Sequence, residues 1–116
     1  PLRSNMSSLT MYIAGPMRGY PNHNFDAFHK AEKRWAKKTS VITKIFNPAR
    51  MDEEEGFDPS IAEDSKEHSR SCMGRDLNAI LKCDALVMLP GWEHSEGARV
   101  EHSLATYLGM PIFYES

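Results

Sequence analysis

The sequence predicts an α/β domain in which helices cover both faces of a mostly parallel sheet of four to five strands, a three-layer sandwich. Short apolar segments rich in β-branched or aromatic residues alternate along the chain with longer segments of helical period. Gly, Pro or Asn stands at the ends of most of these segments. The length of 116 residues suits one domain and is too short for a separate substrate domain.

The first half of the domain is expected to contain two strands and one helix. Residues 9–14 form an apolar segment that ends at Gly15-Pro16, as expected for a strand that leads into a turn. Asn24 is a candidate N-cap for an amphipathic helix. Residues 41–46 are rich in β-branched residues and stop at Asn47-Pro48, which predicts the second strand. The apolar face of the helix consists of Phe25, Phe28, Ala31 and Trp35.

The second half is expected to continue the alternation. Residues 51–64 are rich in acids and contain Gly and Pro, which predicts an exposed loop with a solvated acidic surface. A helix is expected over about 66–82, a third strand over 85–89, a helix after Ser95 and a last strand over 111–114. The domain would span residues 9–116, with residues 1–8 a disordered terminus or a cloning remnant.

Composition excludes several classes of function. The formal net charge of −2 and a pI near 6.2 provide no basic field for nucleic acid. No apolar stretch approaches the length of a membrane span, so no membrane partner and a cytoplasmic location are expected. Cys72 and Cys83 match no zinc motif and are expected to be reduced thiols. His68 and Cys72 are the one pair at helical spacing worth checking, and no metal is expected.

The segment from Gly91 to Glu101 combines a predicted anion site with a carboxylate. Ser95 stands as the N-cap of a helix, with the N–H groups of Glu96, Gly97 and Ala98 expected to be free to bind an anion. Gly97, without a side chain, allows a ligand to approach the backbone closely. Glu101 would face the same crevice about one turn further along. The turn after the first strand, residues 15–19, is expected at the same edge of the sheet.

Four segments in this order resemble the nucleoside 2-deoxyribosyltransferase-like family, which includes nucleoside 5′-monophosphate N-glycosidases. They are Tyr12-Ile13-Ala14-Gly15-Pro16-Met17-Arg18-Gly19, Arg75-Asp76-Leu77-Asn78, Cys83-Asp84-Ala85-Leu86-Val87 and Ser95-Glu96-Gly97-Ala98-Arg99-Val100-Glu101. The resemblance covers residues 12–114 and implies a flavodoxin-like, Rossmann-like fold. It also implies a nucleotide or nucleoside substrate, no cofactor, and a homodimer or higher oligomer in which a neighbour completes the site.

The resemblance assigns the chemistry to three residues. Glu101 would be the nucleophile that attacks the anomeric carbon, which suits a carboxylate because the transition state resembles an oxocarbenium ion. Asp76 would be the acid/base that protonates the departing base. Tyr12 would orient the nucleophile, although an aromatic residue on a strand also fits simple core packing.

The remaining candidate residues concern substrate binding. By the same resemblance Arg18, Ser95 and Gly97 would hold a 5′-phosphate, with Gly15 and Gly19 flanking Arg18. Met17, Tyr20 and Trp92 are candidates for a surface against the base, and the two aromatic residues fit an interface equally well. Arg99 and Pro16 depart from the residues common in the family, and the acidic segment 51–64 matches no motif of it.

Three functions stay open on the sequence alone. The first is cleavage or transfer of the N-glycosidic bond of a (deoxy)nucleoside 5′-monophosphate, and the two reactions differ only in whether water or a second base attacks the intermediate. The second is a non-catalytic nucleotide-binding or sensing module of the same fold, against which the presence of both Glu101 and Asp76 argues. The third is a structural α/β domain that binds no nucleotide.

Overall fold

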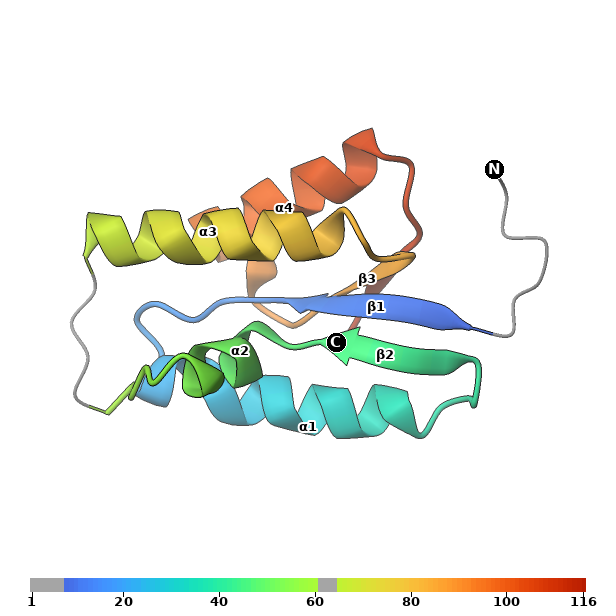
Figure 1. The fold of residues 1–116 in the computed structure, drawn as a ribbon, viewed down its shortest axis with the longest axis horizontal. Helices are drawn as coiled ribbons and strands as arrows, with labels where there is room; N and C mark the ends of the chain where they lie inside the picture. The colour runs from blue at the N-terminus through green and yellow to red at the C-terminus, as the bar shows by residue number, and fades with distance from the viewer. Residues whose placement is uncertain (1–7, 61–64) are drawn as a thin grey trace.

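The structure, a computed structural model, describes residues 8–60 and 65–116, in which four strands form one parallel sheet (Figure 1). The strands are β1 (Leu9–Ala14), β2 (Ile42–Phe46), β3 (Ala85–Met88) and β4 (Ile112–Tyr114). Their spatial order is β2-β1-β3-β4, and each neighbouring pair runs parallel. Of the predicted disordered terminus, residues 1–7 lie outside the described residues.

Helices cover both faces of this sheet. They are α1 (Phe25–Ala36), α2 (Pro48–Glu54), α3 (Lys66–Ile80) and α4 (Glu96–Tyr107), with the short 3-10 turns η1 (Pro21–Asn24) and η2 (Trp92–His94). Figure 1 shows α1 and α2 on one side of the strands and α3 and α4 on the other. The predicted three-layer α/β sandwich, flavodoxin-like and Rossmann-like, is therefore confirmed. No helix in the described ranges has the length and apolar character needed to cross a membrane.

Alternation along the strands divides the apolar residues into two cores. Successive side chains of a strand point to opposite faces. Met11 and Ile13 of β1 accordingly pack with α1 and α2, whereas Tyr12 and Ala14 pack with α3 and α4. All four side chains are buried. Because Tyr12 alternates with Met11 and Ile13 along β1, its side chain points to the opposite face of the sheet, which α3 and α4 cover.

Side-chain caps fix where three helices begin. Ser65 accepts a hydrogen bond from the N–H of His68 at the start of α3, and Ser95 accepts one from Ala98 at the start of α4, as predicted for Ser95. Asn47 caps α2 through bonds from Ala49 and Arg50, with Pro at the first helical position.

The predicted N-cap of α1 is confirmed in position, but the expectation that its side chain caps the helix is wrong. Asn24 occupies the cap position with φ +61°, in the left-handed region, and its side chain makes no capping hydrogen bond. Its Nδ2 instead donates to the carbonyl oxygen of Pro16 at 2.9 Å. Asparagine tolerates the left-handed region better than most residues, so Asn24 serves to tie the loop after β1 to the start of α1.

The prediction of a solvated acidic loop over 51–64 is also wrong for its first part. Residues 48–54 form α2, and Asp52 within it is only 4% exposed. The sequence showed a run of acids, but the cap at Asn47 begins a helix whose inner face carries one of them. Residues 61–64 lie outside the described part of the chain.

The strand order places a topological switch point between β1 and β3. The chain leaves β1 toward β2 on one side, and then crosses back to β3 on the other side of β1. Ligands of open α/β sheets bind beyond the carboxyl ends of the strands at such a point. Ala14 and Met88, paired at the ends of β1 and β3, therefore mark where a site is expected.

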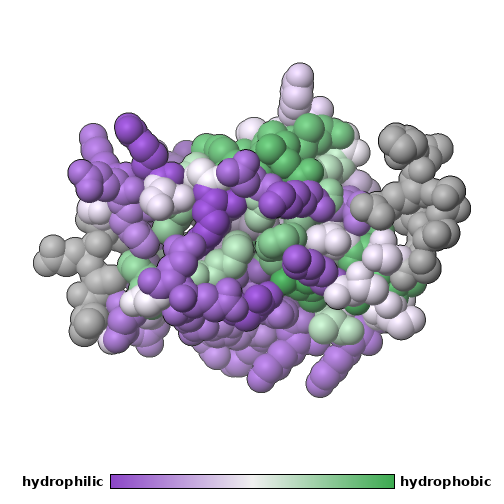
Figure 2. All heavy atoms as spheres, in the orientation of Figure 1, coloured by the Kyte–Doolittle hydropathy of each residue, from purple (hydrophilic) through white to green (hydrophobic). Residues whose placement is uncertain are grey.

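Apolar side chains are also exposed on the α3–α4 side. Figure 2 shows hydrophobic residues gathered on the upper part of the molecule, where α4 and the end of α3 lie. Leu81, Val100 and Leu108 are 58%, 45% and 43% exposed.

Candidate active site

A cavity of about 470 Å³ opens at the switch point. The loop after β1, the inner sides of α2 and α3, and the start of α4 form its walls. Most of the site residues predicted from the sequence line it, namely Gly15, Met17, Arg18, Asp76, Ser95, Gly97 and Glu101. The fold therefore brings together segments that lie more than eighty residues apart in the sequence.

The floor of the cavity holds a hydrogen bond between Tyr12 and Glu101. The hydroxyl of Tyr12 donates to Oε2 of Glu101 at 2.6 Å, and both residues are buried, at 0% and 5% exposure. Tyr12 does not line the cavity but supports Glu101 from behind. Burial and the charge of Glu101 raise the pKa of Tyr12 well above 10, which keeps its hydroxyl a donor at neutral pH.

Glu101 is held in an environment that disfavours its charge. Burial, followed by the nearby charge of Asp76, raises the pKa of Glu101 to about 8. The hydrogen bond from Tyr12 and the positive charge of Arg75 act in the opposite direction and offset part of the rise. A carboxyl group with a perturbed pKa in a cavity is typical of a functional site.

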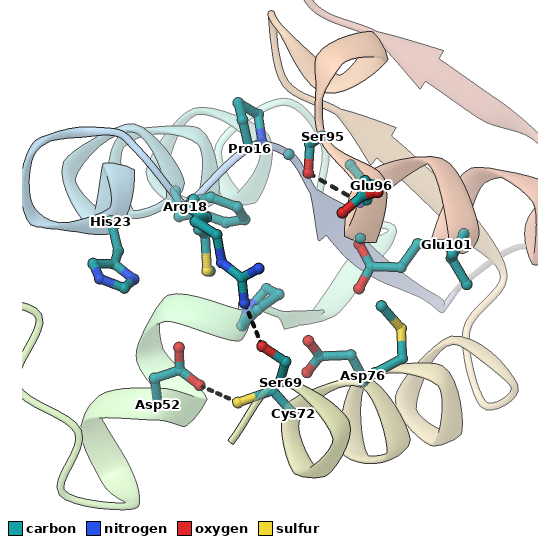
Figure 3. A pocket seen from close by; sticks show the side chains of 18 of the residues that line it. Pro16, Arg18, His23, Asp52, Ser69, Cys72, Asp76, Ser95, Glu96 and Glu101 are labelled. Carbon is teal, nitrogen blue, oxygen red and sulfur yellow. Dashed lines mark hydrogen bonds between the residues drawn. The ribbon is translucent and has the colours of Figure 1, made fainter. Parts of the chain in front are cut away.

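Asp76 lies on α3 and faces Glu101 across the cavity floor (Figure 3). Burial raises the pKa of Asp76 to about 6, against the opposing effect of Arg75. The charge of Asp76 raises the pKa of Glu101, so the two carboxyl groups titrate as a coupled pair. With these pKa values the pair holds one proton around neutral pH, mostly on Glu101.

Arg75 connects this carboxyl pair to α2. Its Nε and Nη2 contact Oδ1 of Asp76 at 2.9 and 2.8 Å, and its Nη1 contacts Asp52 at 2.7 Å and Glu55 at 3.1 Å. Burial lowers the pKa of Arg75, but Asp76 and Asp52 outweigh it and leave the pKa above its ordinary value. The sequence interpretation gave no role to Arg75 or Asp52, because nothing in a run of acids shows which one turns inward.

Three free N–H groups are predicted at the start of α4, and in the structure one of the three is already hydrogen-bonded. Oγ of Ser95 accepts the N–H of Ala98 at 3.2 Å, so that N–H is occupied. The N–H groups of Glu96 and Gly97 lie in the first turn, where a helix offers no acceptor. Two N–H groups, not three, are therefore oriented for an anion.

Arg18 reaches across the cavity from the loop after β1. Its Nη2 donates to Oγ of Ser69 on α3, a residue that the sequence interpretation missed (Figure 3). Arg18 and Ser95 line the same cavity, so a guanidinium and a helix start face one space. Both groups favour an anionic ligand.

Two predicted binding residues, Trp92 and Gly19, do not line the cavity, and a third, Gly15, lines it but is also required by packing. Trp92 does not line the cavity; it stacks on His102 with ring centroids 4.3 Å apart. Gly19 is also absent from the cavity wall and forms a turn with φ +87°. Gly15 does line it, but a Cβ there would lie 2.8 Å from Cβ of Leu89, so packing of the loop alone requires glycine. Met17 and Tyr20 are the members of the proposed base surface that face the cavity.

The pair His68 and Cys72 forms no metal site. Sγ of Cys72 lies 3.4 Å from Nε2 of His68 and donates to Oδ1 of Asp52 at 3.7 Å. Burial and the charge of Asp52 raise the pKa of Cys72 to about 12, so the group is a thiol. Within residues 8–60 and 65–116 no three His, Cys, Asp or Glu side chains are arranged to hold a metal ion.

Comparison with protein families places the chain in one of them. Residues 9–114 match a family described as a domain of unknown function, DUF4406. The chain belongs to this family. The match runs from β1 to β4, so every residue named in the DUF4406 cavity lies within it. No curated protein matches the sequence.

Proposed function

We propose that this DUF4406 domain cleaves, or transfers, the N-glycosidic bond of a (deoxy)nucleoside 5′-monophosphate. The observation that carries the proposal is the position of Glu101, which is bonded to Tyr12 and faces Asp76 in a cavity that also contains an anion-binding helix start. The four segments that resemble the nucleoside 2-deoxyribosyltransferase-like family supply most of these residues.

Two carboxyl groups sharing one proton suit this reaction. The pKa values of about 8 for Glu101 and about 6 for Asp76 place the shared proton mostly on Glu101 at pH 7, so the reactive form is the one in which the proton has moved to Asp76. In that form the ionised Glu101 attacks C1′ of the sugar, and a C1′–O bond forms as the C1′–N bond breaks. Asp76 gives its proton to the departing base, which leaves neutral. Water, or a second base, then attacks C1′ and loses a proton to Asp76, while the Glu101 carboxylate is released. Atoms and charge balance without a metal or cofactor.

The phosphate would bind at the opposite end of the sugar. The N–H groups of Glu96 and Gly97 and the guanidinium of Arg18 supply donors and positive potential. Arg18 bonds to Ser69 in the described structure, so phosphate binding would exchange or share that contact. A Cβ on Gly97 would meet Cε of Met73 at 3.5 Å, so packing alone leaves room for a methyl group at this position.

We further propose that the domain acts as a homodimer or higher oligomer. Large apolar side chains are exposed near the end of α4 and on β4, including Tyr107 at 86% and Phe113 at 44%. Aromatic residues such as these are enriched in protein–protein interfaces relative to the rest of the surface. Light scattering across a dilution series tests this, and a mass equal to one chain at all concentrations would contradict it.

Incubation with ribo- and deoxyribonucleosides and their 5′-monophosphates, with and without an acceptor base, tests the function. Free base is followed by chromatography, and exchange of bases reveals transfer. Glu101→Gln should abolish release of base, whereas Glu93→Gln, an exposed glutamate outside the cavity, should not. Release that persists in Glu101→Gln rules out the nucleophile. Binding without release would support a sensing module, and no binding a structural domain.

A comparison of a nucleoside 5′-monophosphate with its free nucleoside tests whether Arg18 binds the phosphate. Arg18→Ala should lower kcat/KM for the monophosphate and leave the free nucleoside nearly unchanged. Arg99→Ala is the matched control, because Arg99 is exposed on α4 and does not line the cavity. An equal loss for both substrates in Arg18→Ala would remove Arg18 from the phosphate site.

A further inference from the structure

Arg75 contacts carboxyl groups through all three of its side-chain nitrogens. Its Nε and Nη2 approach Oδ1 of Asp76 at 2.9 and 2.8 Å, and its Nη1 approaches Oδ1 of Asp52 at 2.7 Å and Oε1 of Glu55 at 3.1 Å. The side chain belongs to the cavity wall and is only 18% exposed. Because every nitrogen already faces a carboxyl group, Arg75 is poorly placed to bind a substrate phosphate as well.

Both contacts to Asp76 fall on one oxygen of its carboxyl group. Nε of Arg75 donates a hydrogen bond to Oδ1, and Nη2 lies at ion-pair distance from the same atom. A proton on Oδ1 would face these N–H donors and the positive charge, so the proton of Asp76 belongs on Oδ2. A protonated carboxyl keeps acceptor capacity on its other oxygen. Arg75 can therefore hold Oδ1 both before and after Asp76 gives up its proton.

Asp52 holds the far side of the guanidinium. It lies on α2, its side chain is only 5% exposed, and Sγ of Cys72 donates to its Oδ1 at 3.7 Å. Arg75 and Asp76 are neighbours on α3, so a contact between them alone would leave the long arginine side chain several rotamers. With a second contact on α2, the planar guanidinium is held from two helices. The orientation of Asp76 thus depends on how α2 packs against α3.

The charge of Arg75 also acts on the acid that it contacts. Burial raises the pKa of Asp76 to about 6, and the charge of Arg75 is the main opposing effect. For Glu101, whose pKa burial raises to about 8, the hydrogen bond from Tyr12 opposes the rise more than Arg75 does. Weaker contact with Arg75 should therefore raise the pKa of Asp76 and make it a poorer proton donor.

We propose that Arg75 is a positioning residue for the acid: anchored to α2 through Asp52, it holds one oxygen of Asp76 and leaves the other to carry the proton for the departing base. This inference rests on the proposed function, because it takes Asp76 to be the acid. General acid catalysis contributes about 10²–10⁴-fold, and a misplaced acid loses part of it. Arg75→Lys keeps the charge but not the planar fork. It should lower kcat for a nucleotide by about 10- to 100-fold and leave KM nearly unchanged.

Substrates with different leaving groups separate positioning of the acid from a general structural role. In 4-nitrophenyl 2-deoxyriboside 5-phosphate the leaving group departs as the nitrophenolate anion, so no proton from Asp76 is needed. A C1′–O bond to Glu101 forms as the C1′–O bond to nitrophenolate breaks, and the absorbance of the first turnover reports this step alone. Arg75→Lys should stay within a few-fold of the wild type here. Its first-turnover release of base from a nucleotide should remain about 10- to 100-fold slower.

Arg70→Lys is the matched control, because Arg70 is exposed on the same helix and does not line the cavity. It should leave both rates unchanged. Asp52→Asn weakens the anchor on α2 and should repeat the pattern of Arg75→Lys in milder form, which also serves if Arg75→Lys folds poorly. Equal losses on both substrates, a change confined to KM, or no loss on the nucleotide overturn the proposal. Wild-type rates in Asp52→Asn overturn the anchoring role of Asp52.

Carbon-13 NMR of the aspartate carboxyl groups separates this inference from the proposed function. The pKa of Asp76 should be higher in Arg75→Lys than in the wild type, because the hydrogen bond from Nε is lost, and unchanged in Arg70→Lys. If the wild type cleaves neither substrate but this rise is found, the hold of Arg75 on Asp76 stands and the proposed catalysis fails. If the wild type releases base and Arg75→Lys alters neither the titration nor the rates, catalysis stands and positioning fails.

Discussion

Tyr12 and Glu101 lie 89 positions apart in the sequence and meet in a buried hydrogen bond of 2.6 Å. Tyr12 faces α4 because it is an even-numbered residue of β1, and Glu101 faces β1 because it lies on the buried side of α4, with Ala98 and Ala105. The bond is the principal donor contact to the proposed nucleophile. Its removal should therefore change both the rate and the proton affinity of the carboxyl pair.

Tyr12→Phe tests that coupling. The ring should still fill the core, but the donor that lowers the pKa of Glu101 is lost, so this pKa should rise further. The proton then stays on Glu101 more often, and the maximal rate should fall by about 10- to 100-fold. The alkaline limb of the pH–rate profile should move to higher pH. Tyr107→Phe, on the exposed surface, is the control. An unmoved profile in Tyr12→Phe would contradict the coupling.

The wild-type pH–rate profile should be bell-shaped. With pKa values of about 8 for Glu101 and about 6 for Asp76, the pair holds one proton between these limits. Below this window both carboxyl groups are protonated and no nucleophile exists, and above it both are ionised and no acid exists. The maximum of kcat/KM should lie at about pH 7. The same profile with a nucleoside substrate excludes titration of the phosphate. A rate that rises continuously to pH 10 would contradict the assignment.

The fold was largely predictable because two signals are local: the spacing of apolar residues within a segment, and the Gly, Pro or Asn residues at its ends. Gly15-Pro16, Asn47-Pro48 and Gly109 stand at the ends of segments whose apolar period the structure reproduces as strands and helices. The capping of α4 by Ser95 was predictable for the same reason. Asn24 stands at the predicted cap position, but its side chain bonds to the carbonyl oxygen of Pro16 and not to the helix, a tertiary contact that no local pattern shows.

The site was predictable only in part, because its remaining residues act through contacts between distant segments. Asp52 and Arg75 are twenty-three positions apart, and no local pattern marks the acid that turns inward. Trp92 carried the same signal as Tyr20, an aromatic residue near a glycine, yet it packs on His102 instead of the cavity. Side-chain direction in these loops depends on packing that the sequence pattern does not encode.

Arg75→Met is expected to destabilise the domain far more than Arg34→Met. Arg75 is 18% exposed and neutralises the buried Asp52 and Asp76, whose charges would be left uncompensated at a cost of about 3–5 kcal/mol. Arg34 pairs with Glu115 but is 51% exposed, and such a surface pair contributes about 0–1 kcal/mol. Urea unfolding at pH 7 measures both. Equal losses would show that the Arg75 cluster contributes no more than a surface pair.

Glu101→Gln should stabilise the folded protein while it abolishes activity. The pKa of Glu101 rises from 4.5 in its ordinary state to about 8 in the folded state, so folding takes up a proton between these values. The free energy of unfolding therefore falls as pH rises through this window and stays reduced above it. Glutamine carries no such proton and can still accept the bond from Tyr12. Urea unfolding should show the variant more stable by a few kcal/mol at pH 8.5, with a gap that narrows toward pH 5. Glu93→Gln should have the same free energy of unfolding as the wild type at each pH. If the difference between Glu101→Gln and the wild type does not depend on pH, the raised pKa of Glu101 is contradicted.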